Sequence, residues 1–382
     1  MRHAAIVGAG IAGLTAALSL ARKGWRVVVI EKAAQLSETG AGLQLSPNAT
    51  HILDRLGLLP VLARDWLEPE TIRLCDGATL KPVAAVSTGA FARDRWGAPY
   101  AALSRAALHS ALLDAVRASP SCRLVTGCAI GASDPAREIA TVTGDAPALV
   151  VGADGLRSTL RRHVPQAGLM KPAGVAAWRL VVPPAEAPEV LDRSNVAAFL
   201  GPGAHLVSYP MGGARGFNIV AITAAPADGD DAAGRATLRA AFSSWHPSLR
   251  SLLDRPENEI GVWLLHGIGE GRWQDGNATV LIGDAAHAMM PFAAQGAAMA
   301  IEDAFELATF VSRGDAVAPA LAAFEAHRRP RIRRVRARGD FNRFAYHARG
   351  PVRLGRDIVL SLRGPERLAS GFDWLYGYRA RD

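Results

Sequence analysis

Residues 4–13 read Ala4-Ala5-Ile6-Val7-Gly8-Ala9-Gly10-Ile11-Ala12-Gly13, and this stretch decides the fold. The first four residues are apolar and predict a short buried strand, and later apolar positions recur at helical spacing. Between them, Gly8 permits a tight turn, Gly10 lets the backbone approach a pyrophosphate, and Gly13 lets the helix pack closely on the strand. The order of strand, glycine turn and helix predicts a βαβ unit that binds a dinucleotide.

The next predicted strand of this unit ends at an acidic residue. Residues 26–30 are mostly apolar, and Glu31 follows them where a ribose-binding carboxylate is expected. We therefore expect the nucleotide part of a cofactor to bind at Gly8, Gly10, Ile11, Ala12, Gly13 and Glu31.

Two further glycine and aspartate motifs follow apolar runs that predict buried strands. The run 149–151 leads into Gly152-Ala153-Asp154-Gly155, and the run 280–282 leads into Gly283-Asp284. We expect all three motifs at the carboxyl edge of one sheet, where open α/β folds bind ligands. Asp284 can accept hydrogen bonds from ribitol hydroxyls, which a flavin carries and NAD lacks. Asp154 fits a helix N-cap and a direct ligand equally well.

Composition sets the outer limits. The 382 residues are 49% hydrophobic, which is enough for a full core and about two domains. The net charge of +8 favours anionic ligands without identifying one. Seven arginines crowd the helical segment 328–338. A solvated helix face is favoured there over a nucleic-acid patch, because no nucleic-acid motif accompanies them.

The remaining composition signals concern compartment and metals. Three cysteines argue against a disulfide framework and favour a cytoplasmic location. No apolar run is long enough to predict a transmembrane helix, and no convincing signal-peptide cleavage site follows the apolar start. No cluster of histidine and cysteine has zinc-site spacing, so no metal site is expected.

The order of the three motifs resembles that of the single-component FAD-dependent aromatic hydroxylases, the group A flavoprotein monooxygenases that include salicylate and 3-hydroxybenzoate hydroxylases. The segments 103–108, 291–304 and 374–378 also resemble this family. The resemblance implies that Arg105 reaches the FAD, and that Pro291, Gly296 and Ala297 lie at the flavin ring.

The resemblance also implies an α/β fold, α+β overall. A doubly wound, Rossmann-type FAD-binding domain would be interleaved with a mostly antiparallel substrate-binding sheet, followed by long C-terminal helices. Short strand-like runs between residues 172 and 268, separated by Gly, Pro and Asp clusters, agree. We expect the FAD-binding domain at residues 1–70, 96–171 and 269–340, the substrate-binding sheet at 71–95 and 172–268, and a C-terminal helical segment at 341–382.

A predicted strand in this sheet carries the candidate catalytic residues. His205, Val207 and Tyr209 are two apart and share one face of the strand. From the residues alone, a structural histidine is the preferred interpretation. Resemblance to the 3-hydroxybenzoate type implies instead that His205 removes the phenolic proton of the substrate, while Tyr209 and Gln295 orient it. An unperturbed imidazole pKa of about 6.5 suits this task.

The implied function is hydroxylation of a small, phenolic aromatic acid by O2 and NADH or NADPH, through a flavin C4a-hydroperoxide. Reduced nicotinamide would bind transiently, because no second dinucleotide unit is present. Two alternatives stay open: another FAD-dependent reaction on the same scaffold, such as a reductase, oxidase or halogenase, and a non-catalytic flavin-binding or nucleic-acid-associated protein. The sequence decides neither the substrate, nor the nicotinamide, nor between a homodimer and a monomer, and we expect no nucleic-acid partner.

Overall fold

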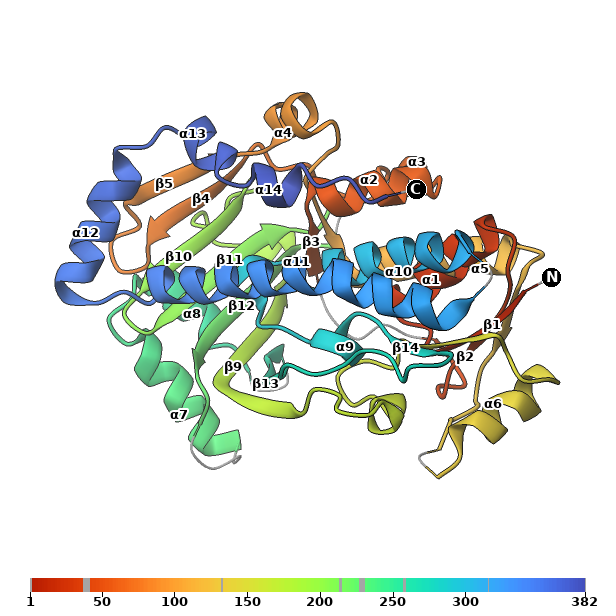
Figure 1. Ribbon diagram of the computed structural model, residues 1–382. Helices are drawn as coiled ribbons and strands as arrows, with labels where there is room; N and C mark the ends of the chain where they lie inside the picture. The colour runs from red at the N-terminus through yellow and green to blue at the C-terminus, as the bar shows by residue number, and fades with distance from the viewer. Residues whose placement is uncertain are drawn as a thin grey trace.

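The computed structural model describes residues 2–36, 42–131, 133–212, 215–226, 231–256, 259–314 and 316–381. Within these ranges the chain forms a parallel sheet, a larger mostly antiparallel sheet, and helices that connect the two (Figure 1). The predicted combination of a doubly wound domain with an interleaved second sheet is confirmed.

The parallel sheet has the strand order β14-β8-β1-β2-β7. Its strands are β1 (His3–Val7), β2 (Arg26–Ile30), β7 (Cys122–Val125), β8 (Leu149–Gly152) and β14 (Thr279–Leu281). The three motifs follow β1, β8 and β14, which are neighbours and run parallel. As predicted, the motifs therefore meet at the carboxyl edge of one sheet.

The first glycine motif turns the chain from β1 into α1 (Ile11–Arg22). Gly8 has a φ of +106°, and a Cβ there would overlap the carbonyl of Ala153 in the second motif. A Cβ on Gly13 would overlap the carbonyl oxygen of Gly8. Both positions require glycine because backbone passes too close for any side chain.

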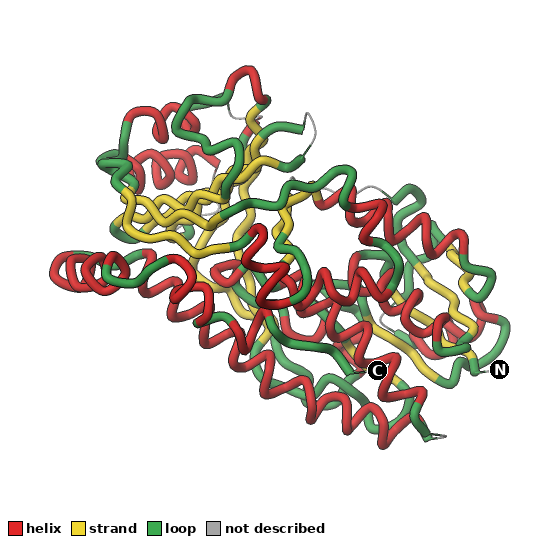
Figure 2. Tube along the Cα trace, turned by 90° about the horizontal axis from the view of Figure 1, so that it is seen from above, coloured by secondary structure: helices red, strands yellow, loops and turns green. Residues whose placement is uncertain are grey.

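The second sheet has the strand order β13-β9-β12-β11-β10-β4-β5, and only the β4–β10 pair is parallel. Figure 2 shows its strands as a group separate from the parallel sheet. Helices α7 (Asp231–Phe242) and α8 (Pro247–Leu253) pack on one of its faces through a hydrophobic cluster. Its strands are β4 (Thr71–Asp76), β5 (Pro82–Ser87), β9 (Met170–Val182), β10 (Val196–Gly201), β11 (Ala204–Pro210), β12 (Phe217–Ala224) and β13 (Gly261–Ile268).

Two long elements pass between the expected domains without interruption. β9 spans the expected boundary at residues 171 and 172, and α11 (Val317–Tyr346) spans the one at 340 and 341. Figure 1 shows α11 running from beside α1 and α10 (Gly296–Ser312) toward the second sheet. These two boundaries therefore do not coincide with the ends of elements.

Shorter elements complete the description. Strands β3 (Gly42–Leu45) and β6 (Ala101–Ser104) form a two-stranded ribbon between the sheets. Among the described residues, no helix is both long and apolar enough to cross a membrane. The other helices are α2 (Pro47–Arg55), α3 (Leu59–Leu62), α4 (Gly89–Trp96), α5 (Arg105–Ala118), α6 (Pro135–Thr143), α9 (Asp284–His287), α12 (Gly350–Ser361), α13 (Pro365–Ser370) and α14 (Asp373–Tyr376), with 3-10 turns at Leu160–His163, Pro184–Glu186 and Pro291–Ala293.

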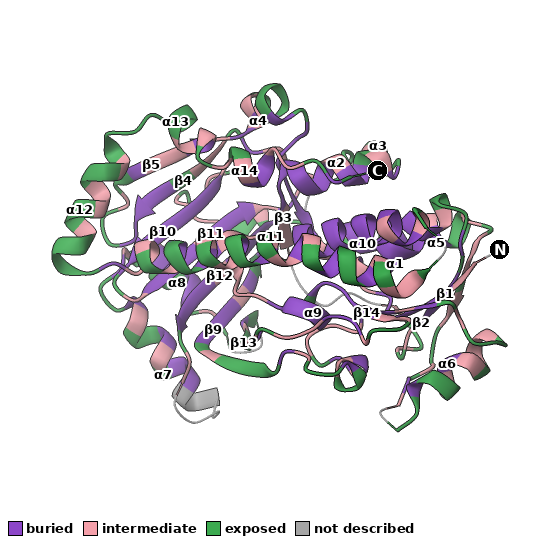
Figure 3. Cartoon of the chain, viewed as in Figure 1, coloured by how far each residue is buried: buried purple, intermediate pink, exposed green. Residues whose placement is uncertain are grey.

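The interpretation of segment 328–338 as a solvated helix face was wrong for part of the segment. Arg328 is fully buried and pairs with Glu302 and Asp303, which follow each other on α10. Figure 3 shows α10 almost wholly buried beneath α11. Arg333, by contrast, is 58% exposed. Arg328 and the 9% exposed Arg331 link α11 to α10, because the buried carboxylates of α10 require a cationic partner.

Candidate active site

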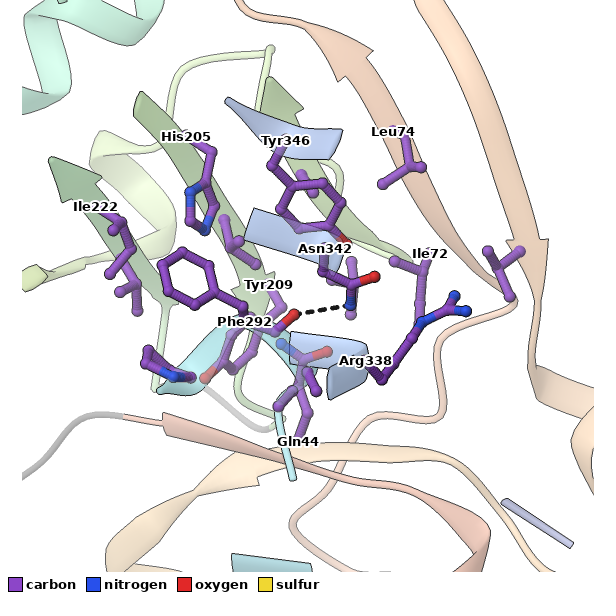
Figure 4. Close-up of a pocket in the computed structure, with 18 of the residues that line it drawn as sticks. Gln44, Ile72, Leu74, His205, Tyr209, Ile222, Phe292, Arg338, Asn342 and Tyr346 are labelled. Atoms are coloured by element: carbon purple, nitrogen blue, oxygen red, sulfur yellow. Dashed lines mark hydrogen bonds between the residues drawn. The ribbon is translucent and has the colours of Figure 1, made fainter. Parts of the chain in front are cut away.

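A cavity of about 370 Å³ lies against one face of the second sheet. Its walls come from the inner face of the second sheet, from β3, from the segment around the start of α10, from the last turns of α11, and from the C-terminal helices α12, α13 and α14. Figure 4 shows side chains from several of these elements converging on one space. Several residues predicted to contact the cofactor are among those that line it: Asp284, Pro291, Gly296, Ala297, and Arg105 from the start of α5.

β11 supplies the polar groups of the sheet wall. His205, Val207 and Tyr209 all line the cavity, and the rings of His205 and Tyr209 are drawn on the same wall in Figure 4. Leu206 and Ser208 are buried on the opposite side. The alternation predicted for this strand is therefore present, with an imidazole and a phenol on the cavity side.

Burial changes the acid–base properties of both groups. Burial, with a smaller effect of the neighbouring His347, lowers the pKa of His205 to about 3. Burial raises the pKa of the Tyr209 phenol above its ordinary value. The expectation that His205 keeps an ordinary imidazole pKa is therefore wrong, because only 4% of the residue is exposed. At neutral pH the wall presents a neutral imidazole and a protonated phenol.

Comparisons with known proteins identify the family of this chain. A family model described as an FAD binding domain matches residues 2–338. 3-Hydroxybenzoate 6-hydroxylase 1 of Aquipseudomonas alcaligenes is 36% identical over 97% of this chain and 96% of its own length. 3-Amino-4-hydroxybenzoate 2-monooxygenase PtmB3 of Streptomyces platensis is 35% identical over 98% and 96%. The chain belongs to the FAD-dependent aromatic hydroxylases.

A solved structure shows the same fold. Klebsiella pneumoniae HpxO, complexed with FAD and uric acid, matches this hydroxylase with a TM-score of 0.78, covering 98% of this chain and 96% of the other. The two sequences are 23% identical, so this likeness concerns the fold.

The glycine motif of the hydroxylase fits the FAD that the family binds. A Cβ on Gly10 would meet no atom within 4 Å, so the loop faces open space there. Gly10 also caps α1 without a side chain, and the first turn of the helix contains no acidic residue. The N–H groups and positive end of the helix are thus available to a phosphate. Ile11 contributes only backbone to this loop, because its side chain is buried in the core.

Glu31 and Asp154, the two acidic residues predicted at the nucleotide site, accept hydrogen bonds from backbone N–H groups. Glu31 accepts hydrogen bonds from the N–H of Ala9 at 2.8 Å and of Ala33 at 2.9 Å, so its carboxylate reaches the glycine loop. One oxygen of Asp154 accepts from the N–H of Thr159 at 2.7 Å, as an N-terminal cap does. Its other oxygen, Oδ1, is buried without a partner among the described residues. Asp154 therefore combines the capping role with a free acceptor.

Gln295 is not among the residues that line the cavity, and its expected role in orienting the substrate stays a prediction. Gln295 precedes α10 and is 2% exposed. Its amide nitrogen donates to Ser46 Oγ at 2.9 Å, and its oxygen accepts from Asn48 at 3.2 Å. Both partners belong to the α2 region, so Gln295 ties the start of α10 to α2. A buried amide turns toward such partners because an unpaired one is costly.

Other side chains take the place expected for Gln295. Gln44 lines the cavity, and its oxygen accepts a hydrogen bond from Tyr100 at 2.8 Å. On α11, Arg338, Asn342 and Tyr346 line the cavity at intervals of four residues, which places them on one helix face. Asn342 donates to the carbonyl of Phe292 at 2.9 Å (Figure 4). The four-residue spacing of Arg338, Asn342 and Tyr346 could have indicated a shared helix face in the sequence. The neighbouring arginines made the segment resemble a solvent-exposed helix instead.

Proposed function

We propose that this hydroxylase acts on a monohydroxylated benzoate, with NADH or NADPH as reductant and O2 as oxidant. One observation carries the proposal. The same cavity is lined by Asp284, Pro291 and Gly296, from the segments that resemble the flavin-contacting parts of the family, and by His205 and Tyr209. An aromatic ring in this cavity would lie between a flavin and a proton acceptor.

Cationic side chains support an acidic substrate. Arg179 and Arg338 line the cavity, and the Nε atom of each is buried without a hydrogen-bond partner among the described residues. A buried cationic donor without a partner is unfavourable, and a carboxylate would satisfy it. The apolar remainder of the wall, including Ile72, Val207 and Ile222, would contact the aromatic ring.

The side chains of this chain have separate tasks in the proposed reaction. His205, neutral at pH 7, accepts the phenolic proton and so makes the ring more nucleophilic. Tyr209 stays protonated and donates a hydrogen bond to the substrate. The start of α10 at Gly296 and Ala297 directs N–H groups and a positive helix end toward charge that develops beside it. Bound FAD supplies the redox chemistry with O2.

The choice of 3-hydroxybenzoate as first candidate rests on the relatives. Proteins named 3-hydroxybenzoate 6-hydroxylase are 36%, 32% and 31% identical over nearly the whole chain. Proteins named 3-amino-4-hydroxybenzoate 2-monooxygenase are 34% to 36% identical. Both groups act on benzoates that carry a hydroxyl group, and this shared chemistry matches the imidazole and the arginines of the cavity.

The test is NADH and NADPH oxidation by the FAD-loaded protein under air, with product analysis. The panel contains 3-hydroxybenzoate, 4-hydroxybenzoate, salicylate, 3-amino-4-hydroxybenzoate and 6-hydroxynicotinate, with benzoate as the control that lacks a phenol. We expect faster oxidation and a dihydroxylated product with 3-hydroxybenzoate. Oxidation that yields only peroxide for every compound would favour an oxidase or reductase, and no stimulation by any compound would contradict the proposal.

We also propose the organisation and location of the enzyme. The seven-stranded sheet would serve as the substrate-binding unit and the parallel sheet as the FAD-binding unit, with α11 common to both. The three cysteines of the sequence are free thiols, which fits the reducing cytoplasm that we propose.

A further inference from the structure

The cavity histidine has a second histidine behind it. His205 Nδ1 lies 2.8 Å from Nε2 of His347, which directly follows the last residue of α11. The ring centroids are 5.0 Å apart. No described residue forms a recorded hydrogen bond with the other nitrogen of His205, Nε2, although the residue lines the cavity. One nitrogen of His205 is therefore committed to His347, and the other is available to a ligand.

The backbone holds His347 in this position from two sides. Its N–H donates to the carbonyl of Arg343 at 3.1 Å, which continues the helical pattern of α11. Its carbonyl accepts from the N–H of Gly203 at 3.3 Å, in the turn that joins β10 to β11. That turn lies two residues before His205. The end of α11 and the start of β11 are thus joined by backbone and side chain together.

The two histidines differ in their access to solvent. His205 is 4% exposed, whereas His347 is partly exposed. Burial, together with Arg343 and Arg349, lowers the pKa of His347 to about 4. Tyr346, whose ring lies 5.3 Å from that of His205, is kept protonated because burial raises its pKa. Both imidazoles are therefore neutral at pH 7, and a positive charge is better tolerated near the surface than in the cavity.

Two neutral imidazoles 2.8 Å apart share one proton, and the tautomers follow from the chemistry. If His205 is to accept a phenolic proton at Nε2, its existing proton must be on Nδ1 and must point at His347 Nε2. His347 must then carry its own proton on Nδ1. In this state His205 donates its Nδ1 proton to His347, and His347 carries a proton on Nδ1 that it can donate to solvent.

Resting on the proposed function, we propose that His347 is a positioning residue that sets the tautomer of His205 and passes the substrate proton to solvent. The phenolic O–H bond breaks as a bond forms to His205 Nε2. The proton on His205 Nδ1 moves to His347 Nε2, and the proton on His347 Nδ1 leaves to water. One proton leaves the substrate and one enters the solvent, so His205 ends neutral and the negative charge stays on the phenolate oxygen.

The relay removes a difficulty that His205 alone would face. An isolated imidazole with a pKa of about 3 would hold a phenolic proton poorly, since it would have to remain charged inside the cavity. Transfer to His347 avoids this state. The competing interpretation is a structural pair that only fastens α11 to β11. A purely structural pair would function with either tautomer of His205. Replacing His347 would then lower the stability of the protein without lowering kcat.

The first test needs no substrate. ¹⁵N-histidine NMR of the FAD-loaded protein reports the tautomer of each of the 10 histidines, with the pair assigned from the signals lost in His205→Gln and His347→Gln. We expect both members to be neutral from pH 8 to pH 5.5 with the proton on Nδ1. A proton on Nε2 of His205, or a cationic His347 in this range, would overturn the relay.

The second test measures turnover of 3-hydroxybenzoate. In His347→Gln the amide oxygen can still accept from His205 Nδ1, but it cannot carry a proton onward. We expect kcat to fall about 10- to 100-fold with unchanged FAD content and substrate Kd. His347→Ala should lose as much and recover when free imidazole is added. The matched control is His266→Gln, because His266 is partly exposed on β13 and does not line the cavity.

The outcomes separate the two proposals. If His347→Gln and His347→Ala keep the kcat of the His266→Gln control, the relay is wrong while the proposed function stands. If imidazole does not restore His347→Ala, the residue acts through structure alone and the relay is overturned. If the unmodified enzyme does not hydroxylate 3-hydroxybenzoate, the proposed function fails for that substrate, and the NMR tautomers alone decide the relay.

Discussion

Arg328 Nη1 lies 2.7 Å from Glu302 Oε2, and both side chains are fully buried. The Nε atom of the same guanidinium lies 2.8 Å from Asp303 Oδ1. This pairing joins α11 to α10, and residues of both helices line the cavity. One buried arginine thus links α10 to the helix that carries Arg338, Asn342 and Tyr346.

Replacing this arginine should destabilise the protein strongly. Arg328→Met removes the guanidinium that pairs with both Glu302 and Asp303. Of their ion pairs, Glu302 then keeps the one with Arg331, and Asp303 keeps the one with His287. Breaking a buried pair in this way costs about 3–5 kcal/mol. The free energy of unfolding, from denaturant titration, measures this loss. The control Arg333→Met removes an exposed arginine of the same helix and should change nothing measurable. Equal stability of the two variants would show that the buried pair is not a clamp.

Substitutions at two glycines of the first motif should affect FAD binding and protein stability separately. Gly10→Ala adds a Cβ that meets no protein atom, so the FAD-free protein should lose at most about 1 kcal/mol. The same Cβ would enter the space where the pyrophosphate is expected, so FAD affinity should fall at least tenfold. Gly13→Ala should instead destabilise the FAD-free protein, because its Cβ overlaps the carbonyl of Gly8. Thermal unfolding and flavin fluorescence titration measure the two effects, and normal FAD affinity in Gly10→Ala would contradict this assignment.

The value of kcat/KM should not fall at about pH 6.5, where an ordinary histidine becomes protonated. The neutral form of His205 is the proton acceptor, and a pKa lowered to about 3 keeps it neutral at all pH values above about 4. Between pH 8 and pH 5.5, kcat/KM should therefore not fall through protonation of His205. An acidic limb with an apparent pKa near 6.5 that disappears in His205→Asn would show that the imidazole is not shifted in the working enzyme.

Gln295 should behave as a structural residue. Gln295→Met removes the hydrogen bonds to Ser46 and Asn48, each with a net contribution of about 0.5–1.5 kcal/mol, while Ser46 and Asn48 keep their bond to each other. The Kd for 3-hydroxybenzoate should change less than it does in Gln44→Met, because Gln44 lines the cavity. Ligand titration and denaturant unfolding of both variants test this. Weaker substrate binding with unchanged stability in Gln295→Met would support the role predicted from the sequence.

Features encoded by local spacing could be predicted from the sequence. The three glycine and aspartate motifs each follow a short apolar run, and β1, β8 and β14 form where those runs occur. The alternation in β11 likewise follows from the period of a strand. These features can be predicted because the backbone geometry of a strand or turn depends on only a few neighbouring residues.

Features set by distant partners could not be predicted. Gln295 turns away from the cavity because of Ser46 and Asn48, about 250 residues earlier in the chain. The pKa of His205 depends on burial by α11 and on His347, which follows that helix. No local pattern reports either contact. Arg328 also resembles its exposed neighbours in sequence, although it alone meets three carboxylates of α10.

We propose that one cavity holds a phenolic acid beside a flavin, and that the enzyme inserts an oxygen atom into the aromatic ring. The most direct test is turnover of 3-hydroxybenzoate with NADH under ¹⁸O2, followed by mass spectrometry of the product. We expect a dihydroxybenzoate that carries one ¹⁸O atom, formed in step with NADH oxidation. Unchanged 3-hydroxybenzoate with all reducing equivalents recovered as peroxide would contradict it.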